Sequence, residues 1–327
     1  MRVILTGGAG YIGSHVALNL IDSGHDVHII DNLSTGNISL IPNKAMFTKC
    51  DITDSAKIDD IFKTNQFDII MHFAGYIQVE ESVNFPEKYF KNNTTDAIKF
   101  FKICKNNNLN KVIFSSTAAV YGNSQNGNNV SEEDILKPEN PYAKSKMETE
   151  NFLRENSSDF KYIILRYFNV AGADLNLRAG QVSKKSTHLI KILSELAIGK
   201  RDNIEVFGND YNTHDGTAVR DYIHVSDLAD IHIQVAKYLL KNDISEIFNC
   251  GYGNGYSVLD VINSVIKITN NSINYKMANR RNGDVEKLIS KINKLQKHIN
   301  WNPKYNDLET IIKSSIDWEK KINEKVS

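Results

Sequence analysis

The chain has 327 residues, too many for most single cores, so we expect one large domain with a smaller companion. Thirty-nine Lys and Arg residues balance thirty-nine Asp and Glu residues, which excludes the strongly positive surface that binds nucleic acid or an anionic membrane. The three separated cysteines form no Cys-x-x-Cys pair, and no histidine clusters with a Cys or a carboxylate, so we expect no metal. No apolar run is long enough to span a membrane, and the unpaired cysteines suit a reducing compartment, so we expect a cytoplasmic protein.

The amino-terminal half alternates short apolar runs with segments of helical spacing. Runs rich in Val and Ile predict strands at Arg2–Thr6, Asp26–Ile30, Ala45–Lys49, Asp68–Phe73, Lys111–Ser115 and Lys161–Tyr167. Between them, helices are predicted at Tyr11–Gly24, Asp54–Asn65, Pro86–Asn107 and Tyr142–Asn156. This alternation is typical of an α/β fold with a doubly wound parallel sheet, in which a ligand binds beyond the carboxyl ends of the strands.

The first predicted strand runs directly into a glycine-rich loop that contains Gly7, Gly10 and Gly13. These glycines let the backbone approach a pyrophosphate, and the dipole of the following helix favours the anion. Asp31 closes the second strand 18 residues after Gly13, where an acidic side chain hydrogen-bonds a ribose and repels a 2′-phosphate. The pattern therefore predicts that the cofactor is NAD and not NADP.

The predicted helix at Tyr142–Asn156 has a clear start, with Asn140 as its N-cap and Pro141 as its first residue. After Gly172 the pattern becomes mixed, and a strand at Ile247–Cys250 is expected to return to the main sheet. The sequence therefore predicts two discontinuous lobes. Residues 1–172 and about 215–250 form a Rossmann-type NAD-binding domain, and residues about 173–214 and 251–327 form a smaller mixed α/β substrate lobe.

Tyr142 and Lys146 are four residues apart, so both lie on one face of that helix. A phenol ionises near pH 10, and making it a base near neutrality requires roughly 4 kcal/mol. A lysine charge about 4 Å away, at an effective dielectric of about 20, supplies a comparable amount. Thr117 follows the fifth strand and offers a hydroxyl where a substrate oxygen would meet the tyrosine. The three residues are candidates for a proton-transfer site.

These three residues resemble the Ser/Thr, Tyr and Lys triad of the extended short-chain dehydrogenases, and the chain is similar to the UDP-glucose 4-epimerases of that family. The likeness runs through Gly7–His15, Asp31–Leu33, His72–Gly75, Tyr121–Gly122, Leu165–Asn169, Val206–Tyr211, Asp215–Val225 and Arg280–Asp284. It implies an isomerase that interconverts UDP-glucose and UDP-galactose through a 4-keto intermediate, with transient hydride transfer to tightly bound NAD. It also implies a homodimer paired through the helices Pro86–Asn107 and Tyr142–Asn156.

The resemblance assigns roles to matching positions. Tyr142 is the general base and acid, Lys146 holds the nicotinamide ribose and tunes Tyr142, and Thr117 bridges the sugar oxygen. The cofactor-binding residues are Gly7, Gly10, Tyr11, Ile12, Gly13, Asp31, Asn32, Asp51, Ile52, Phe73, Ala74, Gly75, Asn92, Lys146 and Tyr167. The UDP-sugar-binding residues are Thr117, Tyr142, Phe168, Asn169, His188, Leu189, Phe207, Arg220, Arg281, Asp284 and Leu288. Arginine suits a diphosphate because its planar fork donates two hydrogen bonds.

Several positions depart from the family pattern. Thr117 is a serine in many relatives, His188 is an asparagine in some, and Ile77 stands where some have a cofactor-facing lysine. Leu288 matches the gate beside the sugar ring, where a tyrosine restricts the pocket, so we expect UDP-N-acetylglucosamine and UDP-N-acetylgalactosamine to be accepted as well. The alternative is that Leu288 only packs within the small lobe.

Two other functions stay open. A nucleotide-sugar 4,6-dehydratase would need an acid pair directly after the triad hydroxyl, where Ala118 and Ala119 stand. A non-catalytic NAD-sensing protein typically lacks the tyrosine or the lysine, and both are present here.

Overall fold

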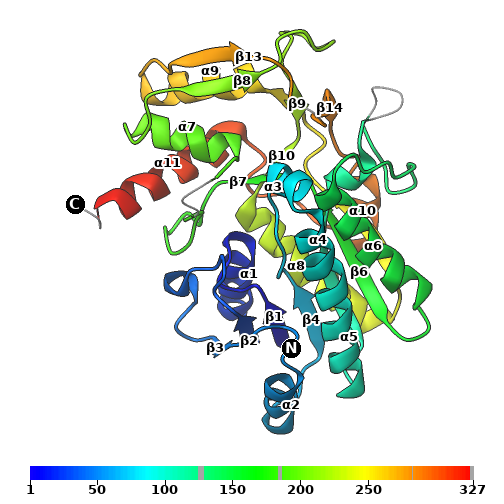
Figure 1. The fold of residues 1–327 in the computed structure, drawn as a ribbon. Coiled ribbons are helices and arrows are strands. Elements are labelled where there is room, and N and C mark those ends of the chain that lie inside the picture. The colour runs from blue at the N-terminus through cyan, green and yellow to red at the C-terminus, as the bar shows by residue number, and fades with distance from the viewer. Residues whose placement is uncertain (124–128, 183–185, 282, 325–327) are drawn as a thin grey trace.

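A seven-stranded sheet forms the centre of the structure, a computed structural model that describes residues 1–123, 129–182, 186–281 and 283–324 (Figure 1). Asn282, which belongs to the Arg280–Asp284 motif, lies outside the described residues. The strands of the sheet are β1 (Arg2–Thr6), β2 (Asp26–Asp31), β3 (Met46–Lys49), β4 (Ile69–His72), β5 (Lys111–Thr117), β6 (Lys161–Tyr167) and β11 (Glu246–Cys250). They pair in parallel in the order β11-β6-β5-β4-β1-β2-β3, which confirms the predicted doubly wound α/β fold.

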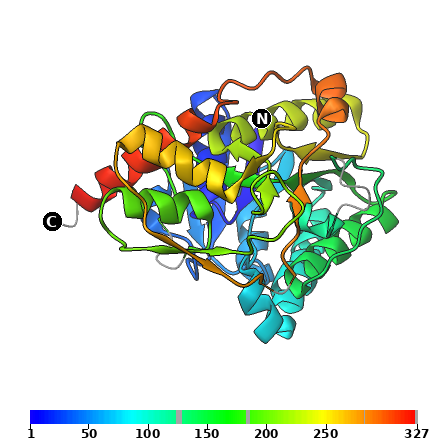
Figure 2. The ribbon, with the colours of Figure 1, turned by 90° about the horizontal axis from the view of Figure 1, so that it is seen from above.

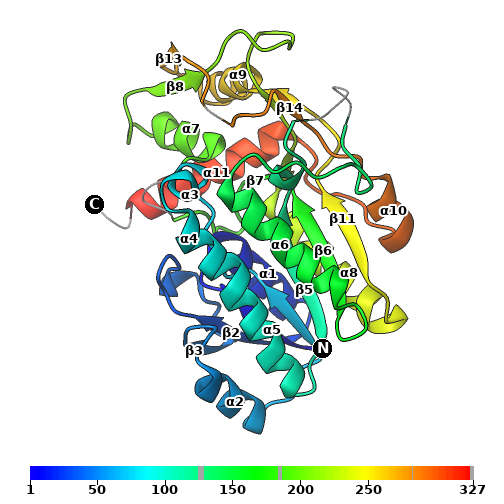
Figure 3. The ribbon, with the colours of Figure 1, turned by 45° about the vertical axis from the view of Figure 1, so that its right-hand side comes forward.

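Helices bury both faces of this sheet, because alternate residues of each strand point to opposite faces. Val3 and Leu5 of β1 belong to a hydrophobic cluster with α1 (Tyr11–Asp22) and α8 (Val225–Asn242). Ile4 belongs to a second cluster with α2 (Ser55–Thr64), α5 (Ala97–Asn106) and α6 (Pro141–Glu155). Figure 3 shows α5 and α6 side by side over this second face. The continuous apolar runs in the sequence reflect this burial on two sides.

The predicted helix over Pro86–Asn107 is not one regular α-helix. It consists of α4 (Pro86–Tyr89), a π-helical segment η2 (Phe90–Asp96) and α5. The preceding helix α3 (Val79–Asn84) was not predicted from the sequence. The wider π turn places Asn93 and Thr94 against α6, where Asn93 Nδ2 donates to Ser145 Oγ at 3.1 Å and Thr94 Oγ1 donates to the Ser145 carbonyl oxygen at 2.8 Å. Side-chain periodicity does not reveal such a local widening, which often marks a functional site.

The second lobe covers the carboxyl ends of the central strands (Figures 1 and 2). Outside the central sheet, β7 (Asn169–Ala171) pairs with β10 (Tyr222–His224), β8 (Ile204–Phe207) with β13 (Tyr275–Ala278), and β9 (Val219–Arg220) with both β12 (Tyr256–Ser257) and β14 (Lys287–Leu288). The helices α7 (Leu189–Ala197), α9 (Val258–Thr269) and α11 (Leu308–Glu324) pack against one another, and α10 (Asn293–Ile299) contacts β11. Two short 3₁₀ helices, η1 (Ile38–Leu40) and η3 (Ala118–Tyr121), complete the described elements. The boundaries of the two lobes stay a prediction.

None of the helices in the described part of the chain is long and apolar enough to cross a membrane.

Candidate functional site

The glycine loop between β1 and α1 is packed so closely that side chains have no room. A Cβ atom on Gly7 would lie 2.6 Å from the Ala74 nitrogen, and one on Gly13 would lie 2.4 Å from the Gly7 oxygen. Gly7 also has a φ of +72°, which L side chains rarely adopt. Gly10 is the N-cap of α1 and offers no side-chain cap, so the first turn of α1, with Tyr11 and Ile12, leaves its N–H groups for an anion.

Asp31 lies beside this loop at the carboxyl end of β2 and is buried. Its carboxylate accepts hydrogen bonds from the backbone nitrogens of Ala9 at 3.0 Å and Leu33 at 2.8 Å. Within the described residues it forms no ion pair with a Lys or Arg, so its negative charge is not compensated by the protein. A ribose hydroxyl could donate to this carboxylate, whereas a 2′-phosphate would be repelled.

The other predicted cofactor residues follow β3 and β4 or lie on η2, and they line the same edge of the sheet. Asn32 donates from Nδ2 to Asp51 Oδ2 at 3.0 Å, which holds the residues after β2 and β3 together, and Ile52 is buried beside them. Phe73, Ala74 and Gly75 follow β4 directly. Asn92 on η2 has a buried Oδ1 with no hydrogen-bond partner among the described residues, so it can accept from a ligand. The glycine cradle and this free acceptor fit a dinucleotide.

Tyr142 is held at the start of α6 by the predicted cap. Asn140 Oδ1 accepts a hydrogen bond from the Ala143 nitrogen at 2.9 Å, and Pro141 begins the helix, which confirms both predictions. The Ser145 hydroxyl donates to the Tyr142 carbonyl oxygen at 2.7 Å. The first turn of α6 is thus rigid, with the Tyr142 side chain half-buried at its surface.

Thr117 ends β5 and its hydroxyl is oriented toward Tyr142. Thr117 Oγ1 accepts from the Ala119 nitrogen at 3.1 Å, so its hydrogen is free to donate to the Tyr142 oxygen. Burial raises the pKa of Tyr142, and the hydrogen bond with Thr117 opposes this change. The lowering of the Tyr142 pKa predicted from the sequence therefore needs further positive charge beside the phenol, from Lys146 and from a bound cofactor.

Lys146 is buried one helical turn after Tyr142. Its Nζ donates to the Ser115 carbonyl oxygen at 2.9 Å and lies 5.0 Å from the centre of the Phe114 ring. A Cβ atom on Gly75 would lie 3.2 Å from this Nζ, so the glycine leaves the ammonium open toward the cofactor edge. Burial lowers the pKa of Lys146 to about 8, which the charge of Glu150 opposes, and the side chain is mostly cationic at neutral pH.

Two predicted cofactor-binding tyrosines, Tyr167 and Tyr11, are held in place by hydrogen bonds. Tyr167 ends β6 and its hydroxyl is 2.6 Å from His232 Nε2, while His232 Nδ1 is 2.8 Å from the Leu228 carbonyl oxygen. Since a carbonyl oxygen can only accept, His232 donates from Nδ1 and Tyr167 donates to Nε2. Tyr11 donates to the Gly172 carbonyl oxygen at 2.6 Å, which joins α1 to the chain entering the second lobe.

The predicted diphosphate residues Arg220 and Arg281 lie close to each other and to Asp284. Arg281 Nε donates to Asp284 Oδ2 at 2.9 Å, and its guanidinium lies 4.6 Å from the centre of the Phe207 ring. Arg220 on β9 donates from Nη1 to the Val219 carbonyl oxygen at 2.9 Å and pairs with no carboxylate among the ion pairs of the described residues. Burial lowers the pKa of Arg220, which the charge of Asp284 opposes. A phosphate would supply the anion that Arg220 lacks.

The remaining predicted sugar-binding residues lie around the same opening. His188 is the N-cap of α7 and accepts at Nδ1 from Gln181 Nε2 at 3.3 Å, and Leu189 is the first residue of that helix. Asn169 is exposed at the start of β7, whereas Phe168 before it is buried. Leu288 on β14 pairs with Arg220 on β9 and is buried in a hydrophobic cluster with Ala118 and Phe168. Leu288 therefore lies in the same cluster as Ala118, the residue that follows Thr117.

Sequence reasoning missed several residues that support the site. Glu150, Arg166 and Ser116 form a buried hydrogen-bonded group next to Lys146. Glu150 lies four residues after Lys146, so helical spacing could have placed it on the same face. Arg166 lies within Leu165–Asn169, which resembles the family, but the sequence predicted no role for it.

One expectation about histidines was wrong. His214 lies close to Asp215 and Asp260, and one ligand atom from each lies within 4.8 Å of the others. Asp260 accepts from the Ser257 nitrogen in the capping box that begins α9, and Asp215 accepts from the Ser257 hydroxyl and from the Thr217 nitrogen in the loop before β9. This explains the cluster as part of a helix cap.

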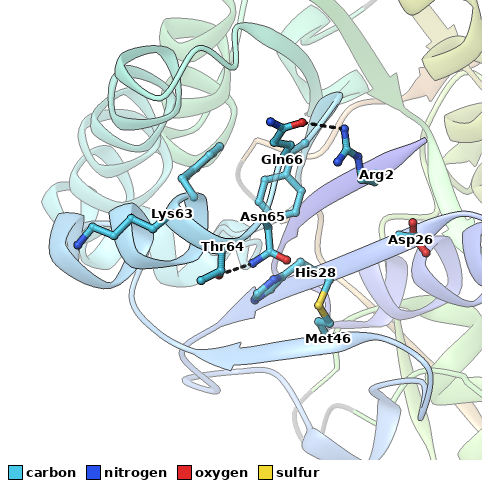
Figure 4. Close-up of a pocket in the computed structure, with 10 residues that line it drawn as sticks. Arg2, Asp26, His28, Met46, Lys63, Thr64, Asn65 and Gln66 are labelled. Carbon is cyan, nitrogen blue, oxygen red and sulfur yellow. Dashed lines mark hydrogen bonds between the residues drawn. The ribbon is translucent and has the colours of Figure 1, made fainter.

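A pocket of about 510 Å³ lies away from this site (Figure 4). Its lining includes Arg2, Asp26 and Met46, which begin β1, β2 and β3. It therefore opens at the amino ends of the strands, opposite the edge at which doubly wound sheets bind ligands.

Comparisons with known proteins identify the family. The model described as "NAD dependent epimerase/dehydratase family" matches residues 3–251. The UDP-glucose 4-epimerase of Azospirillum brasilense is 40% identical over 327 residues, covering 99% of this chain and 94% of that protein. The structure of the UDP-Glc/GlcNAc 4-epimerase of Campylobacter jejuni matches with a TM-score of 0.84 and 43% identity, covering 98% of this chain and 99% of that one. The structure of a UDP-glucose 4-epimerase of Stenotrophomonas maltophila with bound NAD and formylated UDP-arabinopyranose matches with a TM-score of 0.95 and 30% identity, covering 99% of both chains. The chain therefore belongs to the NAD-dependent epimerase/dehydratase family and, within it, to the UDP-glucose 4-epimerases.

Proposed function

We propose that the protein is an NAD-dependent UDP-hexose 4-epimerase that interconverts UDP-glucose and UDP-galactose. The observation that carries the proposal is the meeting of Tyr142 and Thr117 at the cofactor edge of the sheet, with Lys146 buried one turn away. The relatives whose names state this activity cover nearly the whole chain, and one solved relative holds NAD.

The protein's own residues would bind, orient and move one proton. Tyr142 takes the proton of the sugar 4-hydroxyl and returns it after inversion, while Thr117 holds the same oxygen by a hydrogen bond. NAD, held by the glycine loop and Asp31, would supply the hydride chemistry at C4 of the sugar. Arg220 and Arg281 hold the diphosphate, so the hexose ring can turn while the nucleotide stays in place.

We further infer that the substrate range includes UDP-N-acetylglucosamine and UDP-N-acetylgalactosamine. Leu288 lacks the phenol ring that would narrow the sugar pocket, and the Campylobacter jejuni relative is named for both UDP-Glc and UDP-GlcNAc. The burial of Leu288 against Ala118, next to Thr117, is consistent with a position behind the sugar ring.

The proposal includes a homodimer in the cytoplasm. Helices α5 and α6 lie side by side on the outside of the sheet, as expected for helices that pair two subunits (Figure 3). The three cysteines are buried and unpaired, as expected in a reducing compartment.

One experiment tests the function directly. The purified protein is incubated with UDP-galactose or with UDP-N-acetylgalactosamine, without added NAD, and the products are identified. We expect the corresponding gluco sugars and a cofactor that stays bound throughout. A 4-keto-6-deoxy sugar would indicate a dehydratase, and unchanged substrate with retained NAD would indicate a sensing protein.

A further inference from the structure

Glu150 is a buried carboxylate that the proposed mechanism does not use. It lies on α6 one helical turn after Lys146, and its side chain is 0% exposed. Arg166 of β6, also buried, donates from Nε to Glu150 Oε1 at 3.1 Å and from Nη2 to Oε2 at 2.7 Å. The Ser116 hydroxyl of β5 donates to the same Oε1. One carboxylate therefore joins α6 to two strands of the central sheet.

Ser116, which binds Glu150, lies between the two residues of β5 that contact Lys146 and Tyr142. Ser115 accepts from Lys146 through its carbonyl oxygen, and Thr117 donates to Tyr142 through its hydroxyl. Ser116 lies between them and pairs with Arg166 in the sheet register. Its bond to Glu150 therefore sets the position of this strand end against the face of α6 that carries Tyr142 and Lys146.

The charge of Glu150 acts on two buried cations. Although burial opposes the change, the hydrogen bonds and the charge of Glu150 raise the pKa of Arg166. Burial lowers the pKa of Lys146 to about 8, and here too the charge of Glu150 opposes the effect. Removing one partner of a buried pair leaves the other charge uncompensated. Without the carboxylate, Arg166 would repel the charge on Lys146.

We propose that Glu150 is a positioning residue for proton transfer, which keeps Lys146 charged beside Tyr142 and fixes Thr117 opposite the phenol. Glu150 touches neither substrate nor cofactor and acts only through Lys146, Ser116 and Arg166. The inference rests on the proposed function, since it concerns the same proton transfer.

The surroundings make Lys146 the group that titrates just above neutrality. The ionisable groups facing Lys146, Glu150 and Tyr142 are His72 on β4, Tyr89 on α4, Tyr121 on η3, and Tyr162, Arg166 and Tyr167 on β6. Burial lowers the pKa of His72 to about 3 and raises the pKa of each of these tyrosines. A loss of activity between pH 7 and 9 therefore reports on Lys146.

The test measures kcat/KM for UDP-galactose against pH in the holoenzyme and in Glu150→Gln. In Glu150→Gln, we expect the alkaline limb of the profile of kcat/KM against pH to move to lower pH by about one unit or more. The reason is that the variant removes a unit of negative charge one helical turn from Lys146. The double variant Glu150→Gln with Arg166→Met removes both charges and should move the limb back toward the wild-type position. Glu319→Gln is the matched control, because it breaks the buried Lys191–Glu319 pair in the second lobe, and its limb should stay in place.

A second measurement does not depend on turnover. The ionisation of Tyr142 is followed in the NAD-bound proteins as the phenolate absorbance of each protein minus that of its Tyr142→Phe counterpart, and Glu150→Gln should raise the pH at which Tyr142 ionises. If the wild type does not epimerise but this shift occurs, the proposed function fails and the positioning role stands. If Glu150→Gln does not fold, Ser116→Ala should give a smaller shift in the same directions. An unmoved alkaline limb together with unchanged Tyr142 ionisation, in whichever of these variants folds, would overturn the inference.

Discussion

Lys146 donates a hydrogen bond from Nζ to the carbonyl oxygen of Ser115 at 2.9 Å, which joins the helix that carries Tyr142 to the strand that carries Thr117. The ammonium is satisfied by the backbone and not by a carboxylate, so its charge remains available to an ionising phenol. Tyr142, Lys146 and Thr117 thus keep their relative positions before a substrate arrives.

The first prediction is that Tyr142→Phe lowers kcat for epimerisation by roughly 10²- to 10⁴-fold, because the phenyl ring cannot exchange a proton with the sugar hydroxyl. The affinity for UDP should hardly change, since Arg220 and Arg281 do not bond to the phenol. Turnover is measured with UDP-galactose and UDP binding by calorimetry. Retention of more than a few per cent of wild-type turnover would remove Tyr142 from its role.

The second prediction concerns the choice of cofactor. Asp31→Ser removes an uncompensated carboxylate beside the glycine loop, so the variant should carry a larger share of NADP, whereas the wild type should carry NAD alone. The cofactor released from denatured protein is identified by chromatography. Asp26→Ser is the control, because Asp26 is an exposed residue at the other end of the same strand. NADP as the main cofactor of the wild type would contradict the assignment.

The third prediction is that Leu288→Tyr selectively depresses the acetylated substrate. Overpacking a close-fitted site costs about 1–3 kcal/mol, so kcat/KM for UDP-N-acetylglucosamine should fall roughly tenfold to a hundredfold relative to UDP-glucose. Leu288→Met keeps the volume and should leave the ratio unchanged. Equal losses on both substrates would mean that Leu288 only supports its hydrophobic cluster, and a wild type inactive on UDP-N-acetylglucosamine would refute the wider substrate range.

The fourth prediction links stability to pH through Lys146. Burial lowers its pKa to about 8, whereas an unfolded lysine ionises near pH 10.4. Below pH 8 both states bind the proton and the fold carries the full cost of the buried charge, about 3 kcal/mol. Between pH 8 and 10.4 only the unfolded chain binds the proton, so this cost disappears and the free energy of unfolding rises with pH.

The free energy of unfolding of Lys146→Met minus that of the wild type should therefore be more positive at pH 7 than at pH 10. Urea unfolding of both proteins at the two pH values measures this difference, and the loss of the bond to Ser115 is common to both conditions. Lys144→Met changes an exposed lysine of the same helix and should show no such dependence. A stability difference that is equal at pH 7 and 10 would argue against a lowered pKa for Lys146.

Much of the central sheet could be predicted from the sequence. The bounds of β1 and β6 agree with the predicted runs Arg2–Thr6 and Lys161–Tyr167, because strands buried on both faces must be apolar throughout. The N-cap at Asn140 was predictable for a local reason, since the side chain bonds a nitrogen only three residues away. The strands β9 and β14 could not be predicted, because two residues are too few to show a periodic pattern.

By itself, the sequence determined the sheet, the glycine loop and the pairing of Tyr142 with Lys146 on one helix, because these depend on neighbours within a few residues or on a repeating pattern. Only the tertiary structure decided what surrounds them. Glu150 meets Arg166 from another element, and Leu288 reaches Ala118 from a distant part of the chain. Such contacts depend on how packed elements fill space and compensate buried charge, which local sequence patterns do not specify.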